Sequence, residues 1–485
     1  MLLPASKTLT GQRATIMVAW LHRWFSIATC LLLAMWFASG MILLFVPFPA
    51  LPAGATLHLM KNVPSALVAV TPTEALRAVP GAQNLRLIAR GETPVYVMQT
   101  DNGAVVIDAA TGERAPELDR AAAQDLARQS FGSQATVTGP VFDYDQWIVH
   151  NRFDMYRPFL RVDVNDSRGT QIYLSARTGE YVQRTDVWQR FWNWPGAVLH
   201  WLYMTPLRAS YEAWDKTVWW LSMVAVIGVG SGFAIGLIRT TAVRRAGRPG
   251  LTYFRARWLR WHHLLGLFAG FFALSWIVSG WLSMDHGRLF SRGAPNDAAA
   301  ANFAGKPLTS AASKFGPAEL ARIDDAVQFQ ITAIGGEPFL AVTRRNGSME
   351  MLDAAVSVQS EGQLDAIVRR GIESAGFSPR MGPGRRVSNE DFYALAEGWP
   401  SGTKEYRSTS GPTIYVYQDK IVTVMDASRA SYAWAYFALH TFNFPILAGR
   451  PALRKVLVLI PLIAGLLLSI TGVVIGYSKL RKSLR

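Results

Sequence analysis

The chain has 485 residues, of which 50% are hydrophobic, and its formal net charge is +15. The apolar residues are gathered in four blocks, which excludes an ordinary soluble protein. The excess of Lys and Arg lies beside these blocks, so the positive charge argues for a membrane protein and against nucleic-acid binding.

The four blocks run over residues 16–45, 217–238, 258–284 and 453–477. Each reaches the ~20 apolar residues that a spanning helix needs. The sequence therefore predicts four transmembrane helices. The long segments between them predict a membrane α-helical protein with soluble α+β parts.

Basic residues indicate the topology. Arg239, Arg244, Arg245, Arg248, Arg255 and Arg257 follow the second helix, and Lys479, Arg481, Lys482 and Arg485 follow the fourth. Because short Lys- and Arg-rich loops stay in the cytoplasm, we expect both termini there and the long segments in the periplasm of a bacterium. The predicted domains are 1–46 (terminus and first helix), 47–216 (periplasmic), 217–238 (second helix), 239–257 (basic loop), 258–284 (third helix), 285–452 (periplasmic) and 453–485 (fourth helix and tail).

Each soluble segment shows twice a pattern of an amphipathic helix followed by strands that end in an Asp-Ala or Ser-Ala turn. In the first segment we predict helices over 73–79 and 120–129 and strands over 94–98, 104–107, 158–164 and 171–174. The strands end at Asp108-Ala-Ala-Thr-Gly-Glu113 and Ser175-Ala-Arg-Thr-Gly-Glu180, where Thr-Gly is a hairpin signal. In the second segment we predict strands over 338–343 and 412–417. Each segment is expected to end in a short interfacial helix that carries a histidine.

Two histidines of the first half recur in the second half at one offset. His22 and His262 are 240 residues apart, and so are His200 and His440. The flanking residues keep this register, as in Trp36/Trp276, Ser39/Ser279, Gly40/Gly280, Gly232/Gly472 and Gly236/Gly476. We therefore expect two tandem helix–domain–helix repeats, related by an approximate two-fold axis along the membrane normal.

These paired histidines indicate a cofactor. Ionisable residues inside membrane spans are usually functional, and helical bundles hold haem between histidines on facing helices. We predict two non-covalent b-type haems, one bound by His22 and His262 and the other by His200 and His440. The competing interpretation is interfacial histidines that bond to lipid or backbone. His263 is an alternative to His262, although Arg23 stands at the position equivalent to His263.

Other residues near these histidines have two interpretations. Arg23, Arg208 and Arg450 are candidates for the haem propionates, but ordinary interfacial arginines would look the same. Gly40 lies 18 residues beyond His22, five helical turns, so both share one face. Small residues at such positions usually serve close helix packing. Room for a macrocycle is the second interpretation.

The chain also resembles a known family. Leu-His-Arg-Trp at 21–24 and Leu-His-Thr at 439–441 are similar to motifs of the PepSY-associated transmembrane family, and the Thr-Gly-Glu hairpins resemble PepSY domains. The resemblance implies haem-carrying reduction of ferric siderophores at the periplasmic side, with the motif histidines at His22, His200, His262 and His440. Two departures are the missing Thr-Gly in the second half and Phe-Asn-Phe-Pro after His440.

Together these features predict an inner-membrane oxidoreductase that passes electrons from an unidentified donor to a periplasmic ferric complex. A quinone, a copper ion or a periplasmic protein are alternative acceptors. The competing function is a non-redox membrane anchor whose PepSY-like parts bind a peptide or protein partner.

Overall fold

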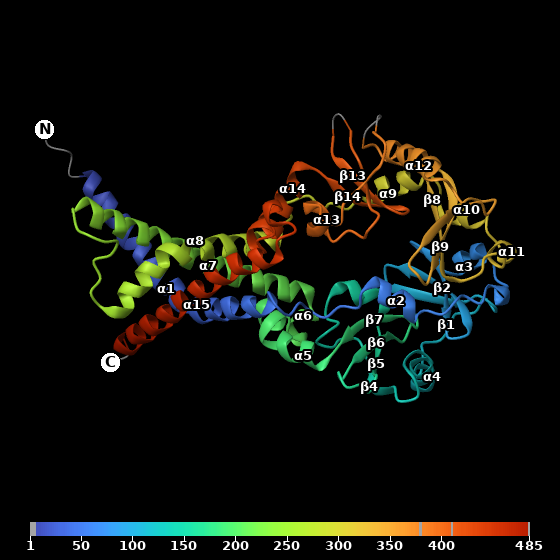
Figure 1. Ribbon diagram of the computed structural model, residues 1–485, viewed down its shortest axis with the longest axis horizontal. Helices are drawn as coiled ribbons and strands as arrows, with labels where there is room; N and C mark the ends of the chain where they lie inside the picture. The colour runs from blue at the N-terminus through green and yellow to red at the C-terminus, as the bar shows by residue number, and fades with distance from the viewer. Residues whose placement is uncertain (1–5, 378–380, 409–410, 484–485) are drawn as a thin grey trace.

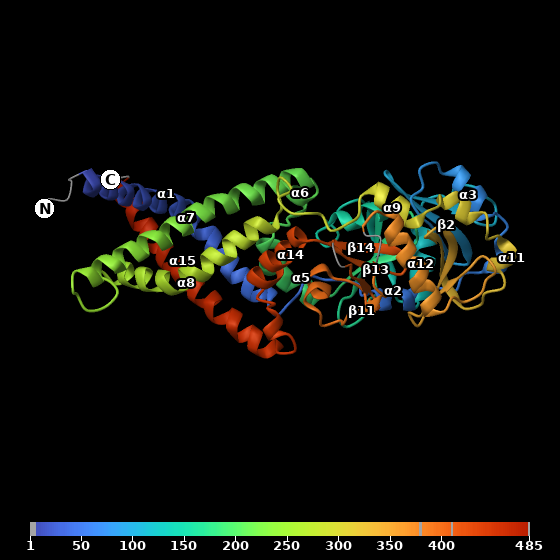
Figure 2. The same ribbon diagram turned by 90° about the horizontal axis from the view of Figure 1, so that it is seen from above.

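The structure is a computed structural model and describes residues 6–377, 381–408 and 411–483. Long helices form a bundle at one end, and a soluble region built on β-sheets forms the other end (Figures 1 and 2). The N-terminus, the C-terminus and the loop between α7 and α8 all lie at the end of the bundle farthest from the soluble region. Residues 1–5 and 484–485 of the predicted terminal domains, Arg485 among them, lie outside the described residues.

Four helices of the described chain are long and apolar enough to cross a membrane, which confirms the four predicted spans. They are α1 (Ser6–Leu43), α7 (Tyr211–Arg245), α8 (Arg257–Ser283) and α15 (Pro451–Ser483). Three of them, α1, α7 and α15, extend several residues beyond the predicted blocks. In α7 the hydroxyl of Ser210 accepts a hydrogen bond from the amide of Ala213, so this cap starts the helix six residues before the apolar block.

The soluble region contains three antiparallel sheets in the described residues. The largest has the strand order β10-β9-β8-β1-β2-β3. Its strands are β1 (Leu85–Arg90), β2 (Thr93–Thr100), β3 (Gly103–Asp108), β8 (Ala326–Ile334), β9 (Glu337–Arg344) and β10 (Met349–Leu352). At its centre β1 pairs with β8, with Arg86 opposite Gln330. One sheet therefore joins the two soluble segments, a connection that the sequence did not indicate.

Each segment also has a four-stranded sheet of its own. The first consists of β4 (Thr136–Phe142), β5 (Phe159–Asp163), β6 (Gln171–Ser175) and β7 (Tyr181–Thr185). The second consists of β11 (Arg385–Arg386), β12 (Lys404–Tyr406), β13 (Thr413–Tyr417) and β14 (Lys420–Met425). The strands predicted at 94–98, 104–107, 158–164, 171–174, 338–343 and 412–417 coincide with β2, β3, β5, β6, β9 and β13.

Shorter helices lie around these sheets and in the connections (Figure 1). They are α2 (Ala53–Leu59), α3 (Pro72–Ala78), α4 (Arg120–Phe131), α5 (Val187–Asn193), α6 (Thr205–Arg208), α9 (Asp297–Ala304), α10 (Leu308–Ala312), α11 (Pro317–Leu320), α12 (Glu361–Ser374), α13 (Phe392–Glu397) and α14 (Ala427–Ala433). The predicted helices at 73–79 and 120–129 are α3 and α4. The main core is shared by both halves and includes Leu87, Tyr96 and Phe329, all buried on the central sheet.

Two connections lead from the soluble region into the bundle and have the same form. In the first, α5 runs into a π-helical turn, Trp194–Val198, and His200 follows two residues later. In the second, α14 runs into a π-helical turn, Trp434–His440, that ends at the histidine itself. Both helices begin with an aspartate cap, Asp186 and Asp426, directly after the last strand of a sheet. Each four-stranded sheet is thereby followed by a helical segment that carries a histidine.

Candidate functional site

The first pair of histidines joins two membrane-spanning helices. His22 lies on α1 and His262 on α8, and the centres of their rings are 6.0 Å apart at an interplanar angle of 33°. Both lie in the half of the bundle near the chain termini, because each is within the first half of its span and both spans begin at that end. The structure thus brings together two residues that are 240 positions apart in the sequence.

The second pair lies at the opposite end of the bundle, next to the soluble region. The rings of His200 and His440 have centres 6.3 Å apart at an interplanar angle of 60°. The two π-helical turns present them to α1 and α8, where Ser39 and Ser279 lie within 3.0 and 3.3 Å of their Nδ1 atoms. The two pairs therefore have closely similar ring separations at two depths.

All four imidazoles use Nδ1 for hydrogen bonding. Nδ1 of His22 lies 3.1 Å from the carbonyl of Gly228, and Nδ1 of His440 lies 3.1 Å from the carbonyl of Trp276. Because a carbonyl only accepts, Nδ1 carries the proton and donates in both rings.

The other two rings reach the same state through hydroxyl groups. Nδ1 of His262 lies 2.8 Å from the hydroxyl of Thr471, which donates its own proton to the carbonyl of Leu468. Nδ1 of His200 lies 3.0 Å from the hydroxyl of Ser39, which donates to the carbonyl of Trp36. A hydroxyl that has donated its proton can only accept from the ring, so Nδ1 donates here too.

This arrangement defines the chemistry of each pair. With the proton on Nδ1, the lone pair of a neutral imidazole lies on Nε2. In the described part of the chain, Nε2 of these four residues makes no hydrogen bond. Each pair therefore carries two nitrogen lone pairs that no hydrogen bond uses, and the Nδ1 bonds fix the orientation of the rings in the manner found behind metal-bound histidines.

Burial keeps His200 and His440 neutral. Burial, together with the neighbouring His440, lowers the pKa of His200 to about 3. Burial also lowers the pKa of His440. Both side chains are consequently neutral at physiological pH, as ligation of a metal requires.

Four glycines make room for the four rings. A Cβ added at Gly232 would lie 2.5 Å from Cε1 of His22, and one added at Gly280 would lie 2.9 Å from Cε1 of His440. Gly40 and Gly472 face Cε1 of His200 and His262 at 3.4 and 3.6 Å by the same measure. Two of the three glycine pairs that the sequence repeats at a common offset, Gly40/Gly280 and Gly232/Gly472, thus face the repeated histidines, whereas Gly236 and Gly476 face Leu267 and Ile27.

The two adjacent histidines on α8 point in different directions. The ring opposite His22 is that of His262, whereas Nε2 of His263 lies 3.1 Å from the carbonyl of Gly236 on α7. His263 is buried, and its Nδ1 has no hydrogen-bond partner within the described residues. Residues one apart on a helix differ by about 100°, so only one of the two can face α1.

Comparison with known protein families places the chain. Residues 19–479 match the family described as the PepSY-associated TM region. The chain belongs to the PepSY-associated transmembrane family. The resemblance expected from Leu-His-Arg-Trp and Leu-His-Thr is therefore confirmed over nearly the whole chain. No curated protein and no solved structure matches it.

The three candidate arginines of this PepSY-associated transmembrane protein lie in different surroundings. Arg23 and Arg450 are exposed. Arg208 is 2% exposed, donates to the side-chain oxygen of Asn151 at 2.8 Å and lies 4.8 Å from the ring centre of Trp214. Its Nε atom is buried without a partner in the part of the chain that the structure describes.

Sequence reasoning missed Arg454 on α15. Its guanidinium donates to the carbonyl of Thr441, the residue after His440. Trp214 stands at the equivalent position, 240 residues earlier, and donates to the carbonyl of Trp201, the residue after His200. In both halves the residue after the histidine, Trp201 or Thr441, thus has a carbonyl that accepts a hydrogen bond from the next spanning helix. The common offset was visible in the sequence, but the change from Trp to Arg hides the equivalence.

The remaining histidines of this family member, His58, His150 and His286, are not part of the two facing pairs. His58 and His150 are exposed, and Nδ1 of His150 accepts a hydrogen bond from the amide of Arg152. His286 pairs with Asp215 at 2.6 Å and lies against the ring of Trp219. None of them stands opposite another histidine in the described residues.

Proposed function

We propose that this protein is a membrane cytochrome that holds two b-type haems, the inner one between His22 and His262 and the outer one between His200 and His440. The observation that carries the proposal is the presence of two facing imidazole pairs with free Nε2 lone pairs. Each pair would supply two nitrogen ligands to a haem iron.

The spacing of the rings fits this role. An imidazole nitrogen binds a transition metal at about 2.0–2.1 Å, and the centre of its ring lies roughly 1 Å behind the nitrogen. One metal between two imidazoles therefore separates the ring centres by about 6 Å. The observed separations are 6.0 Å for His22 with His262 and 6.3 Å for His200 with His440.

When bound, haem supplies one-electron transfer, and its potential depends on axial ligands, burial and neighbouring hydrogen bonds. The side chains of the protein hold and orient the cofactor. Hydrogen bonds from Nδ1 to Gly228, Thr471, Ser39 and Trp276 keep each lone pair directed at the ligand and increase its basicity. A haem iron held by two imidazoles of the protein would be suited to electron transfer.

The two pairs lie at different depths, so electrons could cross the bilayer through this protein. The basic loop between α7 and α8 lies at the same end of the bundle as both termini (Figure 1). On the positive-inside rule that end faces the cytoplasm of a bacterial inner membrane, and the soluble region faces the periplasm. Electrons would then pass from an inner donor, through the inner and outer haems, to a periplasmic acceptor.

The acceptor that fits best is a ferric siderophore or a similar ferric complex, as the family resemblance implies. Hard oxygen ligands of the siderophore type favour Fe(III) over Fe(II), so one-electron reduction weakens their hold on iron. Iron acquisition is then the physiological role. A quinone, a copper ion or a periplasmic protein as acceptor remains compatible with the same two histidine pairs.

A visible spectrum of the full chain, purified in detergent from haem-replete cells, tests the proposal. We expect a Soret band, sharp α and β bands after reduction with dithionite, and two haems b per chain in the pyridine haemochrome assay. Addition of a ferric trihydroxamate should reoxidise the reduced protein. A purified chain without haem would leave only a membrane anchor for a protein- or peptide-binding soluble region.

A further inference from the structure

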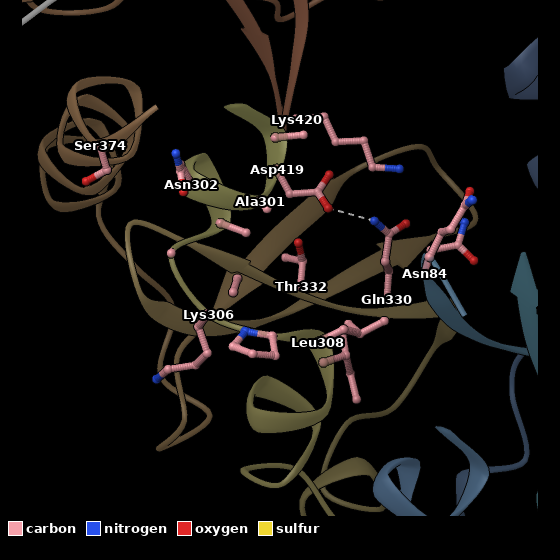
Figure 3. Close-up of a pocket in the computed structure, with 17 residues that line it drawn as sticks. Asn84, Ala301, Asn302, Lys306, Leu308, Gln330, Thr332, Ser374, Asp419 and Lys420 are labelled. Carbon is pink, nitrogen blue, oxygen red and sulfur yellow. Dashed lines mark hydrogen bonds between the residues drawn. The ribbon is translucent and has the colours of Figure 1, made fainter. Parts of the chain in front are cut away.

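The soluble region contains a cavity of about 800 Å³ that is remote from the histidine pairs. It lies between β8, the segment that joins α9 to α10, and the turn between β13 and β14 (Figure 3). Lys420 lines the cavity, and all of β14 and α14 lie between Lys420 and the turn that ends at His440. The volume of the cavity falls within the ~300–1,000 Å³ range of small-molecule sites.

The first half has a matching place that is filled. There the lining comes from β1, the end of α2, the end of α4 and the turn between β6 and β7, but the volume is only about 30 Å³. The correspondence is detailed. Ser130 and Ser374 line the two places and are 244 residues apart, and each turn contributes one acidic residue, Glu180 or Asp419.

Side-chain size accounts for the difference. Leu59, Met60 and Tyr181 occupy the filled place. The open cavity is lined instead by Ala300, Ala301 and Ala304. Ala304 stands 244 residues after Met60, the same offset as for the two serines. The small residues on α9 therefore leave the cavity open, whereas larger side chains fill the equivalent place in the first half.

The open cavity is rich in hydrogen-bond donors that have no protein partner. Five lining side chains make no side-chain hydrogen bond or ion pair within the described ranges: Asn302, Lys306, Thr332, Ser374 and Lys420. Asp419 is 8% exposed, and its Oδ2 atom accepts a hydrogen bond from Gln330 at 2.8 Å. Figure 3 shows Lys420 beside Asp419 and Gln330, with Lys306 and Asn302 on other parts of the wall.

Two lysines against one aspartate give the lining a net positive charge. The spare donors are ammonium, amide and hydroxyl groups, which together favour an oxygen-rich anion. We propose that this cavity binds a small polycarboxylate. Lys306 and Lys420 pair with its carboxylates, and Asn302, Thr332 and Ser374 donate hydrogen bonds to its remaining oxygens. The proposal does not depend on the haems.

Calorimetric titration of the full chain in detergent with citrate tests this inference. The wild type should bind citrate saturably, and affinity should fall as salt is raised because the pairing is electrostatic. The double variant Lys306→Ala/Lys420→Ala should bind at least tenfold more weakly. Ala304→Met, which places the residue of the filled counterpart in the open cavity, should abolish the binding.

Lys61→Ala is the matched control, because Lys61 lines the filled place and pairs with Glu92 outside the cavity. Its affinity for citrate should stay within twofold of the wild type. No saturable binding to the wild type, or equal binding by the double lysine variant, overturns the proposal. If Ala304→Met does not fold, the lysine variant alone decides.

Discussion

Gly232 faces His22 so closely that a Cβ at this position would lie 2.5 Å from Cε1 and 2.6 Å from Nδ1 of the imidazole. Real Cβ atoms do not approach other atoms to this distance, so any side chain at Gly232 must displace the ring. The ring is held in turn by the carbonyl of Gly228, one turn earlier on the same helix. Gly40, Gly232, Gly280 and Gly472 therefore lie against the paired imidazoles, whereas Gly270 and Gly465 pack against phenylalanine side chains of neighbouring helices.

The first prediction follows from this contact. Gly232→Ala should move His22 off its hydrogen bond to Gly228 and reduce the haem content of the inner site by tenfold or more, while the outer site stays loaded. Alanine is itself favoured over glycine in a helix by about 1 kcal/mol, so loss of the helix is not the expected cause. Haem per chain, measured by pyridine haemochrome, checks the result.

Gly230→Ala is the control for that experiment. Gly230 lies on the same helix, and a Cβ there meets only a side-chain carbon of Leu274 at 3.7 Å, an ordinary contact. This variant should retain both haems. Equal haem content in the two variants would show that the close approach to His22 has no bearing on the cofactor.

The histidine pairs were within reach of sequence reasoning, because both pairs and the residues that flank them keep one offset of 240 residues. The choice of His262 over His263 also came from that register. Their hydrogen-bond partners were only partly visible. Ser39 and Ser279 appear in the repeated set, whereas the carbonyl of Gly228 carries no side-chain signal at all. Backbone acceptors become apparent only when the helices are packed.

The second prediction separates the two sites. His22→Ala and His262→Ala should each lose the same haem, and His200→Ala and His440→Ala should each lose the other, so that every variant keeps about one of two. Removal of one axial nitrogen leaves five-coordinate iron that is held far less firmly. Low-temperature difference spectra, which resolve the α bands, identify the haem lost.

His263→Ala and His150→Ala serve as controls for this series. His263 bonds to the carbonyl of Gly236, and His150 lies on the surface. Both variants should retain two haems. Loss of the inner haem from His263→Ala but not from His262→Ala would show that His263, and not His262, binds the inner haem.

The third prediction concerns the bond behind His262. Thr471→Val removes the hydroxyl that accepts from Nδ1 at 2.8 Å and keeps the shape of the side chain. Loss of such a partner typically weakens metal binding by about 10–100-fold. We therefore expect faster transfer of the inner haem to apomyoglobin, together with a shifted midpoint potential.

Ser469→Ala is the matched control on the same helix. Its buried hydroxyl donates to the carbonyl of Gly465 and contacts no histidine through a hydrogen bond. Its rate of haem transfer should equal that of the wild type. If Thr471→Val also leaves the rate and the potential unchanged, the hydroxyl has no role in orienting the ring.

Some strands were predictable from the sequence, but their assembly into sheets was not. The Thr-Gly turns and the alternation of apolar residues located β2, β3, β5 and β6. Nothing in the alternation of β1 or β8 tells which strand will be its neighbour, because both have buried residues on either face. The pairing of Arg86 with Gln330 is a long-range contact between two segments that a spanning helix pair separates in the chain. Such pairings depend on how the helices bring the segments together.

The fourth prediction tests what holds the central sheet to its neighbour. Arg86 on β1 forms a two-pronged ion pair with Glu180, at 2.7 and 3.0 Å, and both side chains are largely buried. Glu180→Ala leaves the guanidinium charge without its partner, although Gln328 still accepts one hydrogen bond. Breaking a buried pair on one side costs about 3–5 kcal/mol, and 1.4 kcal/mol corresponds to a factor of ten. Amide exchange in β1 and β6 should therefore become faster by about a hundredfold or more.

A control and the location of the effect complete that test. Glu212 pairs with Lys216 on the surface of α7, and solvent screens this pair, so Glu212→Ala should leave the exchange in both strands unchanged. The effect of Glu180→Ala should also stay within the soluble region, because the inner histidines lie on helices that this ion pair does not contact. Unchanged haem content with faster exchange in β1 is the expected combination. Slow exchange in the variant would mean that packing of Leu87 and Phe329, rather than the ion pair, holds the sheets in register.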